Sequence, residues 1–440
     1  MYNKKRPLTE WWRSLAMRVG TTGSALALTA VAMGCDRVPA MPTAEMLGAS
    51  PVTVALESCS PSSSSSLRIE TVAAGLDVPW DVVFLPDGRA LITERTGRIR
   101  VVGADGLLEA EPWASIDVYS PSGGEIGLLG IDARQGANGE TEVYVTATVR
   151  PPATNPISRL AGRVGRRVVR VFAPERGQPM TLRVVRLLDR GGRGVEPEVV
   201  VADLPSGELH GGGGLRFGPD GLLYTANGDG TEPPRAQRDT SRRGKIFRYR
   251  PDGSIPGDNP IAGSPTFATG VRHVQALDWL PTGELVAIDH GPTGLAVEGG
   301  RGGDDELNVV ASAGANLGWP IVTGMTQGSA LVSPIAVWPR AIAPAGMTVY
   351  RGASAAWIGS VFVTGLKGGL RRVVLSHGAT GASARCEEVL LPAETYGRLR
   401  LARTAPDGTL WVGTSNRDGR GNARPNDDLV LRLHPPDAPL

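Results

Sequence analysis

The stretch Phe84-Leu-Pro-Asp-Gly-Arg-Ala-Leu-Ile-Thr93 places a Pro-Asp-Gly turn between two short apolar runs. Proline presets the backbone of a β-turn and Asp-Gly completes it, so this pattern predicts two antiparallel strands joined by a tight turn. The same design, with Asp or Thr before the glycine, recurs at residues 217–225, 279–287 and 404–412. The chain is therefore built from a repeated strand–turn–strand unit.

The spacing of the repeat gives its length and number. The turn prolines fall at 86, 219, 281 and 406, which are 133, 62 and 125 residues apart. One spacing near 62 and two near twice that value predict a unit of about 62 to 66 residues, with two degenerate copies. Segments 142–147 and 359–364 can supply strands for those copies, and residues 67–440 hold about six units.

Six repeats of a few antiparallel strands predict a six-bladed β-propeller of four-stranded antiparallel blades. The composition suits an all-β fold, with 59 Gly, 35 Pro and 41% hydrophobic residues in 440, because short strands need many turns. The competing β-sandwich would require two domains, and residues 67–440 contain no segment that reads as a linker.

Residues 1–34 read as an export signal. Basic residues precede an apolar run of about 15 residues, Val19–Met33, which is shorter than the roughly 20 that span a bilayer. Ala32-Met33-Gly34-Cys35 resembles a bacterial lipoprotein processing site, with Cys35 as the acylated residue. Ala30-Val31-Ala32 also fits an ordinary signal cleavage site.

Removal of residues 1–34, which hold five Lys or Arg and one Glu, changes the formal net charge from +2 to −2. The remaining chain therefore does not suggest a nucleic-acid-binding surface. Residues 35–66 are rich in Pro, Ala and Ser and read as a tether. Cys59 and Cys386 either form a disulfide in an exported protein or stay as two thiols.

Residues 289–320, DHGPTGLAVEGGRGGDDELNVVASAGANLGWP, combine a His-Gly-Pro turn with an acidic cluster at Asp304, Asp305 and Glu306. Main-chain carbonyls at such a turn, followed by carboxylates, are the hard oxygen ligands that Ca²⁺ prefers. The alternative is a glycine-rich surface loop with a solvated acidic run.

Two further segments carry groups that can do chemistry. His210 precedes four glycines that remove side-chain bulk, and a neutral imidazole there can act as a general base. Arg398 and Arg400 alternate along a predicted strand, so their guanidinium groups share a face and favour a bound anion. Taken alone, a histidine beside glycines is more often structural, and the arginines can be a basic strand edge that discourages aggregation.

Together these segments resemble the soluble pyrroloquinoline-quinone (PQQ) sugar dehydrogenases of the glucose/sorbosone dehydrogenase family. Residues 289–320 are similar to the family signature HGP…DDELN…NYGWP, and residues 210–221 to its H-x-G-R-L-x-F-x-P-D-G. Three shorter motifs also match: Gly270-Val-Arg-His-Val-Gln275, Gly365-Leu-Lys-Gly-Gly369 and Arg398-Leu-Arg400. The matches run in the family's order over residues 70–435.

The resemblance implies a role for each matched residue. His210 would take the proton of the substrate hydroxyl, Arg272 would reach the quinone and the substrate, and Glu125 would contact the sugar. Lys367, Arg398 and Arg400 would bind the three carboxylates of PQQ. The main-chain oxygens of Gly291 and Pro292 would bind the Ca²⁺ that also holds PQQ, and Glu306 a second, structural Ca²⁺.

The sequence also departs from the family pattern. Leu209 stands where the glucose enzymes carry Asp, Gly214 where Arg is frequent, Glu125 in place of Gln, and His273 in place of Asn. Residues 295–303 form an insertion between the turn and the acidic cluster.

The expected function is oxidation of an aldose, or of a related sugar or aldehyde, at C1 in the periplasm. Electrons would pass to an unidentified periplasmic acceptor, and the membrane would be contacted only through a lipid on Cys35. Two alternatives keep the fold, namely a Ca²⁺-dependent lactonase-like hydrolase and a non-catalytic ligand-binding propeller. The substrate itself is not encoded in a readable motif.

Overall fold

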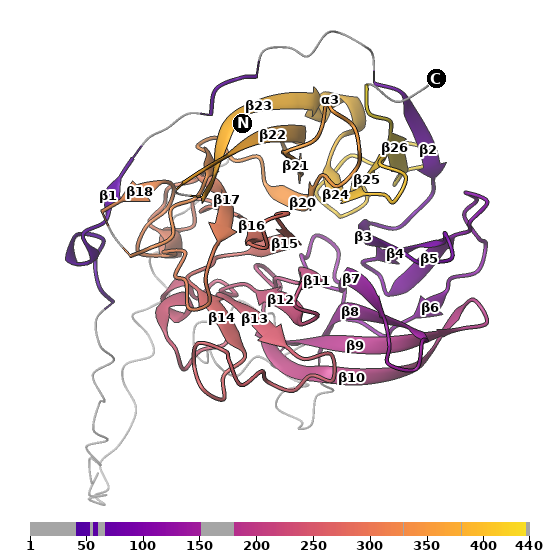
Figure 1. Ribbon diagram of the computed structural model, residues 1–440, viewed down its shortest axis with the longest axis horizontal. Helices are drawn as coiled ribbons and strands as arrows, with labels where there is room; N and C mark the ends of the chain where they lie inside the picture. The colour runs from indigo at the N-terminus through magenta and orange to yellow at the C-terminus, as the bar shows by residue number, and fades with distance from the viewer. Residues whose placement is uncertain are drawn as a thin grey trace, which may run out of the picture. The chain divides into compact units, whose positions relative to one another are not determined.

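The computed structural model describes residues 41–52, 56–59, 67–150, 180–328, 330–379 and 381–436. Residues Met41–Leu440 form one compact unit. Six four-stranded antiparallel sheets lie around a central axis as a six-bladed β-propeller (Figure 1). The fold predicted from the turns is confirmed.

In each blade the first strand lies innermost. The strands of blades 1 to 3 are β3 (Pro79–Phe84), β4 (Ala90–Glu94), β5 (Arg98–Val102) and β6 (Ala114–Ser115); β7 (Leu128–Gln135), β8 (Thr141–Val149), β9 (Met180–Arg190) and β10 (Arg193–Ser206); β11 (Leu215–Phe217), β12 (Leu223–Asn227), β13 (Lys245–Tyr249) and β14 (Thr266–Thr269).

Blades 4 and 5 consist of β15 (Val274–Trp279), β16 (Leu285–Asp289), β17 (Asp305–Val310) and β19 (Ala336–Trp338); β20 (Pro344–Val349), β21 (Ser360–Gly365), β22 (Gly369–Gly378) and β23 (Gly381–Leu391). Blade 6 joins the two ends of the propeller, because β2 (Ile69–Ala73) pairs with β26 (Val430–Leu433), beside β25 (Leu410–Thr414) and β24 (Leu399–Thr404).

All four repeated turns have the same place in the fold. Each joins the innermost strand of a blade to the second strand, as β3 to β4, β11 to β12, β15 to β16 and β24 to β25. The segments proposed for the degenerate copies, 142–147 and 359–364, lie in or at β8 and β21, the second strands of blades 2 and 5. The repeat therefore predicted the number of blades correctly.

The core is divided among the contacts between blades. Six buried apolar clusters each combine side chains of two or three neighbouring blades, such as Leu91 of blade 1 with Val143 of blade 2, and Met347 of blade 5 with Trp338 of blade 4. Because the inner strands are covered on both faces, β3 and β15 are buried at nearly every residue rather than at alternate residues.

A central charge cluster lies on, or directly after, the inner strands. Each blade contributes one residue: Asp81, Asp132, Arg216, Asp278, Arg351 and Arg403. Arg216 donates to both oxygens of Asp81, at 2.6 and 3.0 Å, and Arg351 donates to both oxygens of Asp278, at 3.0 and 2.7 Å. Three carboxylates face three guanidinium groups, so the cluster is electrically balanced.

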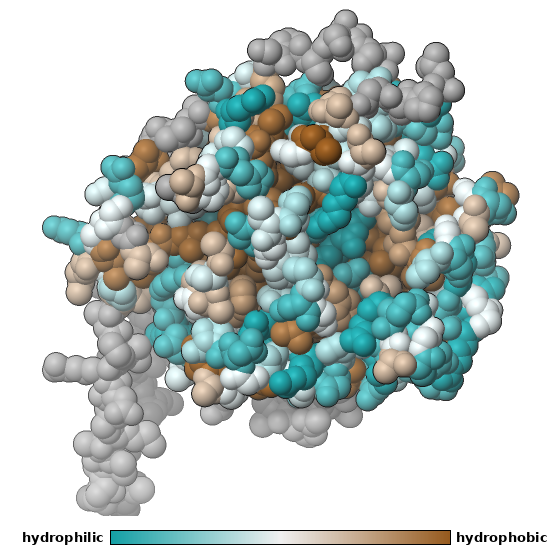
Figure 2. Space-filling model, in the orientation of Figure 1, coloured by the Kyte–Doolittle hydropathy of each residue, from teal (hydrophilic) through white to brown (hydrophobic). Residues whose placement is uncertain are grey.

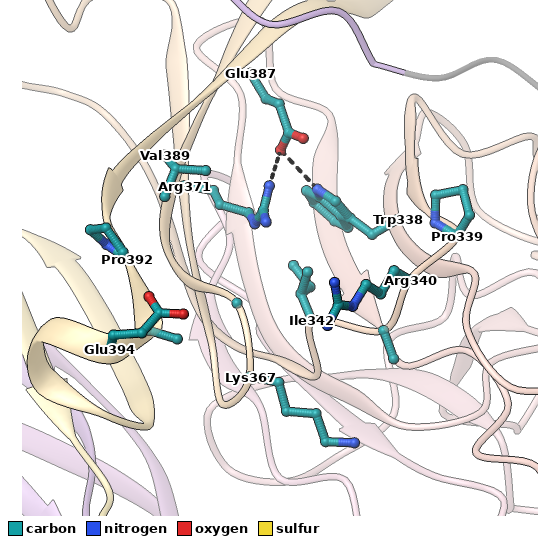
Figure 3. A pocket seen from close by; sticks show the side chains of 13 residues that line it. Trp338, Pro339, Arg340, Ile342, Lys367, Arg371, Glu387, Val389, Pro392 and Glu394 are labelled. Atoms are coloured by element: carbon teal, nitrogen blue, oxygen red, sulfur yellow. Dashed lines mark hydrogen bonds and ion pairs between the residues drawn. The ribbon is translucent and has the colours of Figure 1, made fainter.

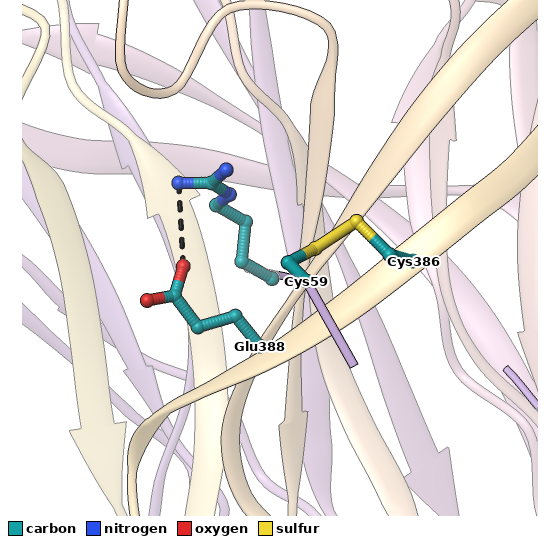
Figure 4. Close-up of a disulfide and its surroundings, with 4 residues drawn as sticks. Cys59, Cys386 and Glu388 are labelled. Carbon is teal, nitrogen blue, oxygen red and sulfur yellow. Dashed lines mark ion pairs between the residues drawn. A yellow bond between two sulfur atoms is a disulfide. The ribbon is translucent and has the colours of Figure 1, made fainter. Parts of the chain in front are cut away.

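The segment before blade 6 is attached to the outside of the propeller. β1 (Ser50–Pro51) pairs with β18 (Thr326–Gln327). Cys59 forms a disulfide with Cys386 of β23, with the Cα atoms 5.0 Å apart (Figure 4). The pairing of these two cysteines, left open by the sequence, is present in the structure, and part of the expected tether 35–66 lies against the domain.

Residues 1–40 lie outside the described residues, and with them the expected export signal and Cys35. None of the helices in the described part of the chain is long and apolar enough to cross a membrane. In Figure 2 the visible face is hollowed near its middle, over the ring of inner strands, and hydrophilic residues line the hollow.

Candidate active site

The candidate site residues lie where the inner strands begin. Glu125 precedes β7, His210 precedes β11, Arg272 precedes β15, and Arg398 precedes β24. Since the inner strands of a propeller run in the same sense around the axis, their starts meet at one end of the channel. Four loops that are distant in sequence thereby come together.

His210 is a buried imidazole held by a carboxylate. Its Nδ1 lies 2.6 Å from Asp229 Oδ1, and the residue is only 4% exposed. Asp229 also accepts a hydrogen bond from Trp319 Nε1 at 2.9 Å. Burial raises the pKa of Asp229, but the hydrogen bond and charge of His210 outweigh it and hold the pKa below its ordinary value. The ionised Asp229 therefore fixes the proton on Nδ1 and leaves Nε2 as the basic atom.

Asp229 was not found from the sequence, where the lack of an Asp at position 209 left His210 without an orienting group. The carboxylate comes instead from the turn after β12, in Asn227-Gly-Asp229-Gly. Gly228 lets the two segments meet, because a Cβ there would lie 2.2 Å from the main-chain oxygen of His210. An Asp between two glycines at a strand end in the same blade was the available signal.

Gly212, the second glycine after His210, is required by the fold. A Cβ added at Gly212 would lie 2.4 Å from the main-chain oxygen of Ala226, and Gly212 has a φ of +72°. Glycine is needed there because the neighbouring strand β12 approaches closely and the backbone is left-handed. The space that a side chain would occupy at this position is therefore taken by β12.

Glu125 and His273 contact each other beside His210. Glu125 Oε2 accepts from the His210 backbone N–H at 2.9 Å and lies 3.2 Å from His273 Nε2. Glu125 Oε1 accepts from Arg420 Nη1 at 2.8 Å. Burial raises the pKa of Glu125, but the hydrogen bond of His273 and the charge of Arg420 outweigh it and hold the pKa well below its usual range. Glu125 is an ionised group in the part of the site where a sugar contact was expected.

The Arg272 guanidinium group is hydrogen-bonded through two of its three nitrogens. Its Nε donates to Glu298 Oε1 at 2.6 Å and its Nη2 to Thr293 Oγ1 at 3.1 Å, and both members of the Arg272–Glu298 ion pair have side chains only 1% exposed. Glu298 belongs to the insertion 295–303, so this added loop has a direct contact with the site. Arg272 Nη1 is buried and has no hydrogen-bond partner among the described residues.

Arg398 and Arg400 converge on one carboxylate, Asp418. Arg398 Nε donates to Asp418 Oδ2 at 2.8 Å, and Arg400 Nη2 lies 3.5 Å from the same oxygen. The anion that the adjacent guanidinium groups require is thus partly supplied by the protein. Burial lowers the pKa of Arg400 to about 9, and its Nη1 has no partner among the described residues.

The two halves of the site are connected through the loop that holds Asp418 and Arg420. Asp418 binds the arginines of blade 6, and Arg420 binds Glu125 of blade 2. Arg95 also reaches this loop, because its Nη2 donates to the Asp418 main-chain oxygen at 3.4 Å. The Asp229 N–H donates to the Arg272 main-chain oxygen at 2.8 Å, which links Arg272 to His210 through Asp229. His210, Arg272, Glu125, Arg398 and Arg400 therefore form one continuous network.

Lys367 lies at the margin of this network. It is exposed in the turn between β21 and β22, next to Leu366, whose carbonyl accepts from Arg398 Nη1 at 3.3 Å. It also lines a cavity of 490 Å³. In Figure 3 its side chain points away from the group formed by Glu387, Arg371 and Trp338. No ion pair of Lys367 occurs among the described residues.

The Gly291-Pro292 turn is held by the acidic segment beside it. Asp305 Oδ1 accepts from Gly291 N–H at 2.9 Å, and Asp305 Oδ2 accepts from Ile342 and Ala343 N–H. The Pro292 carbonyl accepts from Gly303 N–H at 2.9 Å, which leaves it one lone pair for a cation. Asp305 therefore shapes the turn and is not free as a ligand.

Glu306 is buried beside other carboxyl groups. Burial raises its pKa to about 8, with further contributions from Asp289 and Asp304. Its oxygens accept from Gly324 N–H at 2.7 Å and Asn308 Nδ2 at 3.1 Å. A cation would suit these grouped carboxyl groups. Among the described residues, however, no three His, Cys, Asp or Glu side chains are arranged to hold a metal ion.

The same residues fit an anionic, multiply hydrogen-bonding group. Five guanidinium groups, of Arg95, Arg272, Arg398, Arg400 and Arg420, are set against four carboxylates, of Glu125, Asp229, Glu298 and Asp418. Two of the guanidinium groups keep a buried Nη1 without a partner in the described chain. Buried donors are normally satisfied, so the network is suited to an additional acceptor.

Comparison with known proteins shows the family to which this chain belongs. The family model "Glucose / Sorbosone dehydrogenase" matches residues 76–430, which include every site residue from Glu125 to Arg400. The chain belongs to the glucose/sorbosone dehydrogenase family. The family resemblance seen in the motifs is confirmed, and the chain is similar to sugar dehydrogenases, which are oxidoreductases.

Two curated relatives illustrate the family. The chain is 26% identical over 378 residues to an aldose sugar dehydrogenase of Escherichia coli, covering 81% of this chain and 92% of the relative. It is 26% identical over 289 residues to quinoprotein glucose dehydrogenase B of Acinetobacter calcoaceticus, covering 60% and 55%.

Solved structures of the family have the same fold. A PQQ-bound aldose sugar dehydrogenase from Streptomyces coelicolor is 32% identical, with a TM-score of 0.66 over 84% of this chain and 98% of that chain. A putative oxidoreductase (glucose dehydrogenase) from Thermus thermophilus is 36% identical, with a TM-score of 0.69 over 84% and 100%.

Proposed function

We propose that this family member is a PQQ- and Ca²⁺-dependent dehydrogenase that oxidises C1 of an aldose, or of a related sugar or aldehyde, to a lactone or acid. The observation that carries the proposal is the His210–Asp229 pair, 2.6 Å apart, beside two buried guanidinium groups that each keep one free Nη1. The PQQ-bound relative from Streptomyces coelicolor supports the choice of cofactor.

His210 would act as the general base. With its Nδ1–H directed to Asp229, Nε2 is the atom that takes the proton of the C1 hydroxyl. The negative charge of Asp229 stabilises the imidazolium formed in that step, and Trp319 keeps the carboxylate in place. When bound, PQQ would supply the quinone that accepts the hydride, with Ca²⁺ as a Lewis acid on its carbonyl.

Arg398, Arg400 and Lys367 would bind the carboxylates of PQQ, and Arg272 would contact the quinone and the substrate. The free Nη1 atoms of Arg272 and Arg400 support these roles, because each would gain an acceptor. Main-chain oxygens of Gly291 and Pro292 would hold one Ca²⁺, and Glu306 a second. The contact of Glu125 with the sugar stays a prediction, since both of its oxygens already have protein partners.

The proposal includes the place of action. The basic and apolar residues 1–34 favour export to the periplasm, and Cys35 favours a lipid anchor. The Cys59–Cys386 disulfide supports an oxidising compartment. The electron acceptor would be a periplasmic molecule.

The experiment is a dye-linked oxidation assay on a panel of aldoses and aldehydes, after addition of PQQ and CaCl₂ to the purified full chain. Quinone absorbance reports cofactor binding separately from turnover. We expect binding and turnover in the wild type, and binding without comparable turnover in His210→Ala. Equal rates in the two proteins would exclude His210 as the base.

A matched control is His434→Ala, which removes a histidine paired with Glu70 on the outer edge of blade 6 and should leave both readouts unchanged. Lactone hydrolysis without PQQ would instead support a lactonase-like hydrolase, and PQQ binding without any turnover would support a non-catalytic binding propeller.

A further inference from the structure

The loop that carries His210 has an unfavourable backbone. His210 has a φ of +55°, which lies in the left-handed region. A non-glycine residue in that region costs on the order of 1 kcal/mol or more, and the conformation persists only where neighbours enforce it. Something must therefore hold the His210 turn.

Two side chains hold the turn by its peptide groups. Glu125 Oε2 accepts from the His210 N–H at 2.9 Å. His273 Nδ1 accepts from the Gly212 N–H at 3.3 Å. One carboxylate and one imidazole thus bind the first and third N–H groups of the segment 210–212, from blades 2 and 4.

The two side chains also bind each other. Since Nδ1 of His273 is an acceptor, the proton of the neutral ring is on Nε2, which faces Glu125 Oε2 at 3.2 Å and also contacts the side-chain amide of Gln275. Burial lowers the pKa of His273, which keeps its ring neutral at neutral pH. The Glu125–His273 pair is completed by Arg420 on the remaining carboxylate oxygen.

The pair also sets the position of the imidazole of His210. The rings of His210 and His273 are stacked, with centroids 5.5 Å apart and an interplanar angle of 30°. On the other side, Asp229 holds Nδ1 at 2.6 Å. The His210 ring therefore has one neighbour that fixes its proton and another that fixes its plane.

We infer that Glu125 and His273 act as one positioning unit that holds the 210–212 turn and thereby directs His210 Nε2 at the substrate. This inference rests on the proposed function only for the direction of the ring toward a substrate. It assigns Glu125 to positioning and not to sugar binding. Glu at position 125 suits this role better than the family's Gln, because it accepts at both oxygens, one toward His210 and His273 and the other toward Arg420, whereas one terminal atom of Gln is a donor.

The first test does not require activity. Hydrogen–deuterium exchange of the full chain reports the His210 and Gly212 N–H groups, and ¹⁵N-histidine NMR reports the Nδ1 proton of His210. In Glu125→Gln and His273→Asn we expect exchange in peptides over 207–216 to rise by about tenfold, as for loss of one hydrogen bond to a charged or buried group. The Nδ1 proton signal of His210 should shift. Unchanged exchange and an unchanged signal would overturn the inference.

The second test is a double-mutant cycle on sugar oxidation. If the residues act as one unit, the double variant Glu125→Gln/His273→Asn should lose no more kcat than the worse single variant, about tenfold, with little change in the sugar KM. Multiplied effects would show independent residues. A raised KM at unchanged kcat would show Glu125 to be a sugar contact. Either result rejects the positioning unit.

The matched control is the pair Glu70→Gln and His434→Asn, another Glu–His contact with Nε2 and Oε1 3.1 Å apart at the outer edge of blade 6. It should change neither exchange at 207–216 nor kcat. If the wild type oxidises no sugar, the proposed function fails, while the exchange and NMR results still decide whether the pair holds the turn.

Discussion

The candidate active site and the central charge cluster are two charged regions of different character. In the central charge cluster, both Nη atoms of Arg216 and of Arg351 are hydrogen-bonded, only Arg216 Nε is buried without a partner among the described residues, and three carboxylates balance three guanidinium groups. In the candidate active site, Arg272 and Arg400 each keep a buried Nη1 without a partner in the described chain. Terminal Nη donors that are already used hold the fold together, whereas terminal donors left open are suited to a ligand.

Removal of His210 should have the largest effect, because it takes away the proposed base from the open network without touching the balanced one. His210→Ala should lower kcat by about 10²–10⁴-fold, the usual contribution of a general base. The quinone absorbance of bound PQQ should stay close to wild type. An unchanged kcat would contradict the role of His210 as the base.

A break in the central charge cluster should affect stability and not affinity. Asp81→Ala leaves the buried guanidinium group of Arg216, 5% exposed in its side chain, without its carboxylate. We expect the free energy of unfolding to fall by about 3–5 kcal/mol, as when one partner of a buried ion pair is removed. Asp87→Ala, which removes a 52%-exposed carboxylate from Arg89, is the control and should cost little. Equal losses in both would show that burial does not matter here.

Arg400→Met should give the opposite pattern. Its guanidinium group stacks 4.0 Å from the Trp80 ring, and burial already lowers its pKa to about 9, so an apolar side chain suits the position. Stability should change by less than about 1 kcal/mol or increase. The affinity for PQQ should fall by about 10- to 100-fold through the lost charged hydrogen bonds, as measured by absorbance titration. Unchanged affinity would contradict the ligand role of this arginine.

The smallest effect concerns pH. Burial lowers the pKa of His273 below its ordinary value of 6.5. Below pH 6.5 the unfolded chain then binds a proton at this position that the folded chain does not, so stability falls as the pH drops from 6.5 toward the folded pKa. One proton corresponds to about 1.4 kcal/mol per pH unit. His273→Asn should flatten the dependence of urea midpoints on pH between 6.5 and 5 by up to that amount, and an unchanged slope would contradict the burial of this imidazole in its neutral form.

The sequence predicted the fold better than the site because the two depend on different signals. The Pro-Asp-Gly and Pro-Thr-Gly turns are local signals, and all four join two antiparallel strands as expected. Asp229 was not predicted because it lies 19 residues from His210 in the sequence. Their contact also depends on Gly228, which packs against the His210 carbonyl. Glu298 was not predicted because an insertion has no repeat register from which to infer a partner.

Of the residues matched to the family motifs, some lie together with His210 in the structure and others do not. Arg272, Arg398 and Arg400 lie in one network with His210, because each is found at the start of an inner strand. Lys367 stands in a turn between β21 and β22 and lies at its margin. Internal carboxylates such as Asp418 could not be foreseen, because only the fold brings that loop between blade 6 and Arg95 of blade 1.

Blade 6, which joins the two ends of the propeller, also carries part of the candidate active site. Arg398, Arg400, Asp418 and Arg420 all lie in the last part of the sequence, whose strand β26 pairs with β2 from the other end of the propeller. A propeller in which this pairing has not formed would hold these residues less firmly than His210 and Arg272. Retention of an anionic ligand would therefore distinguish closed molecules from open ones.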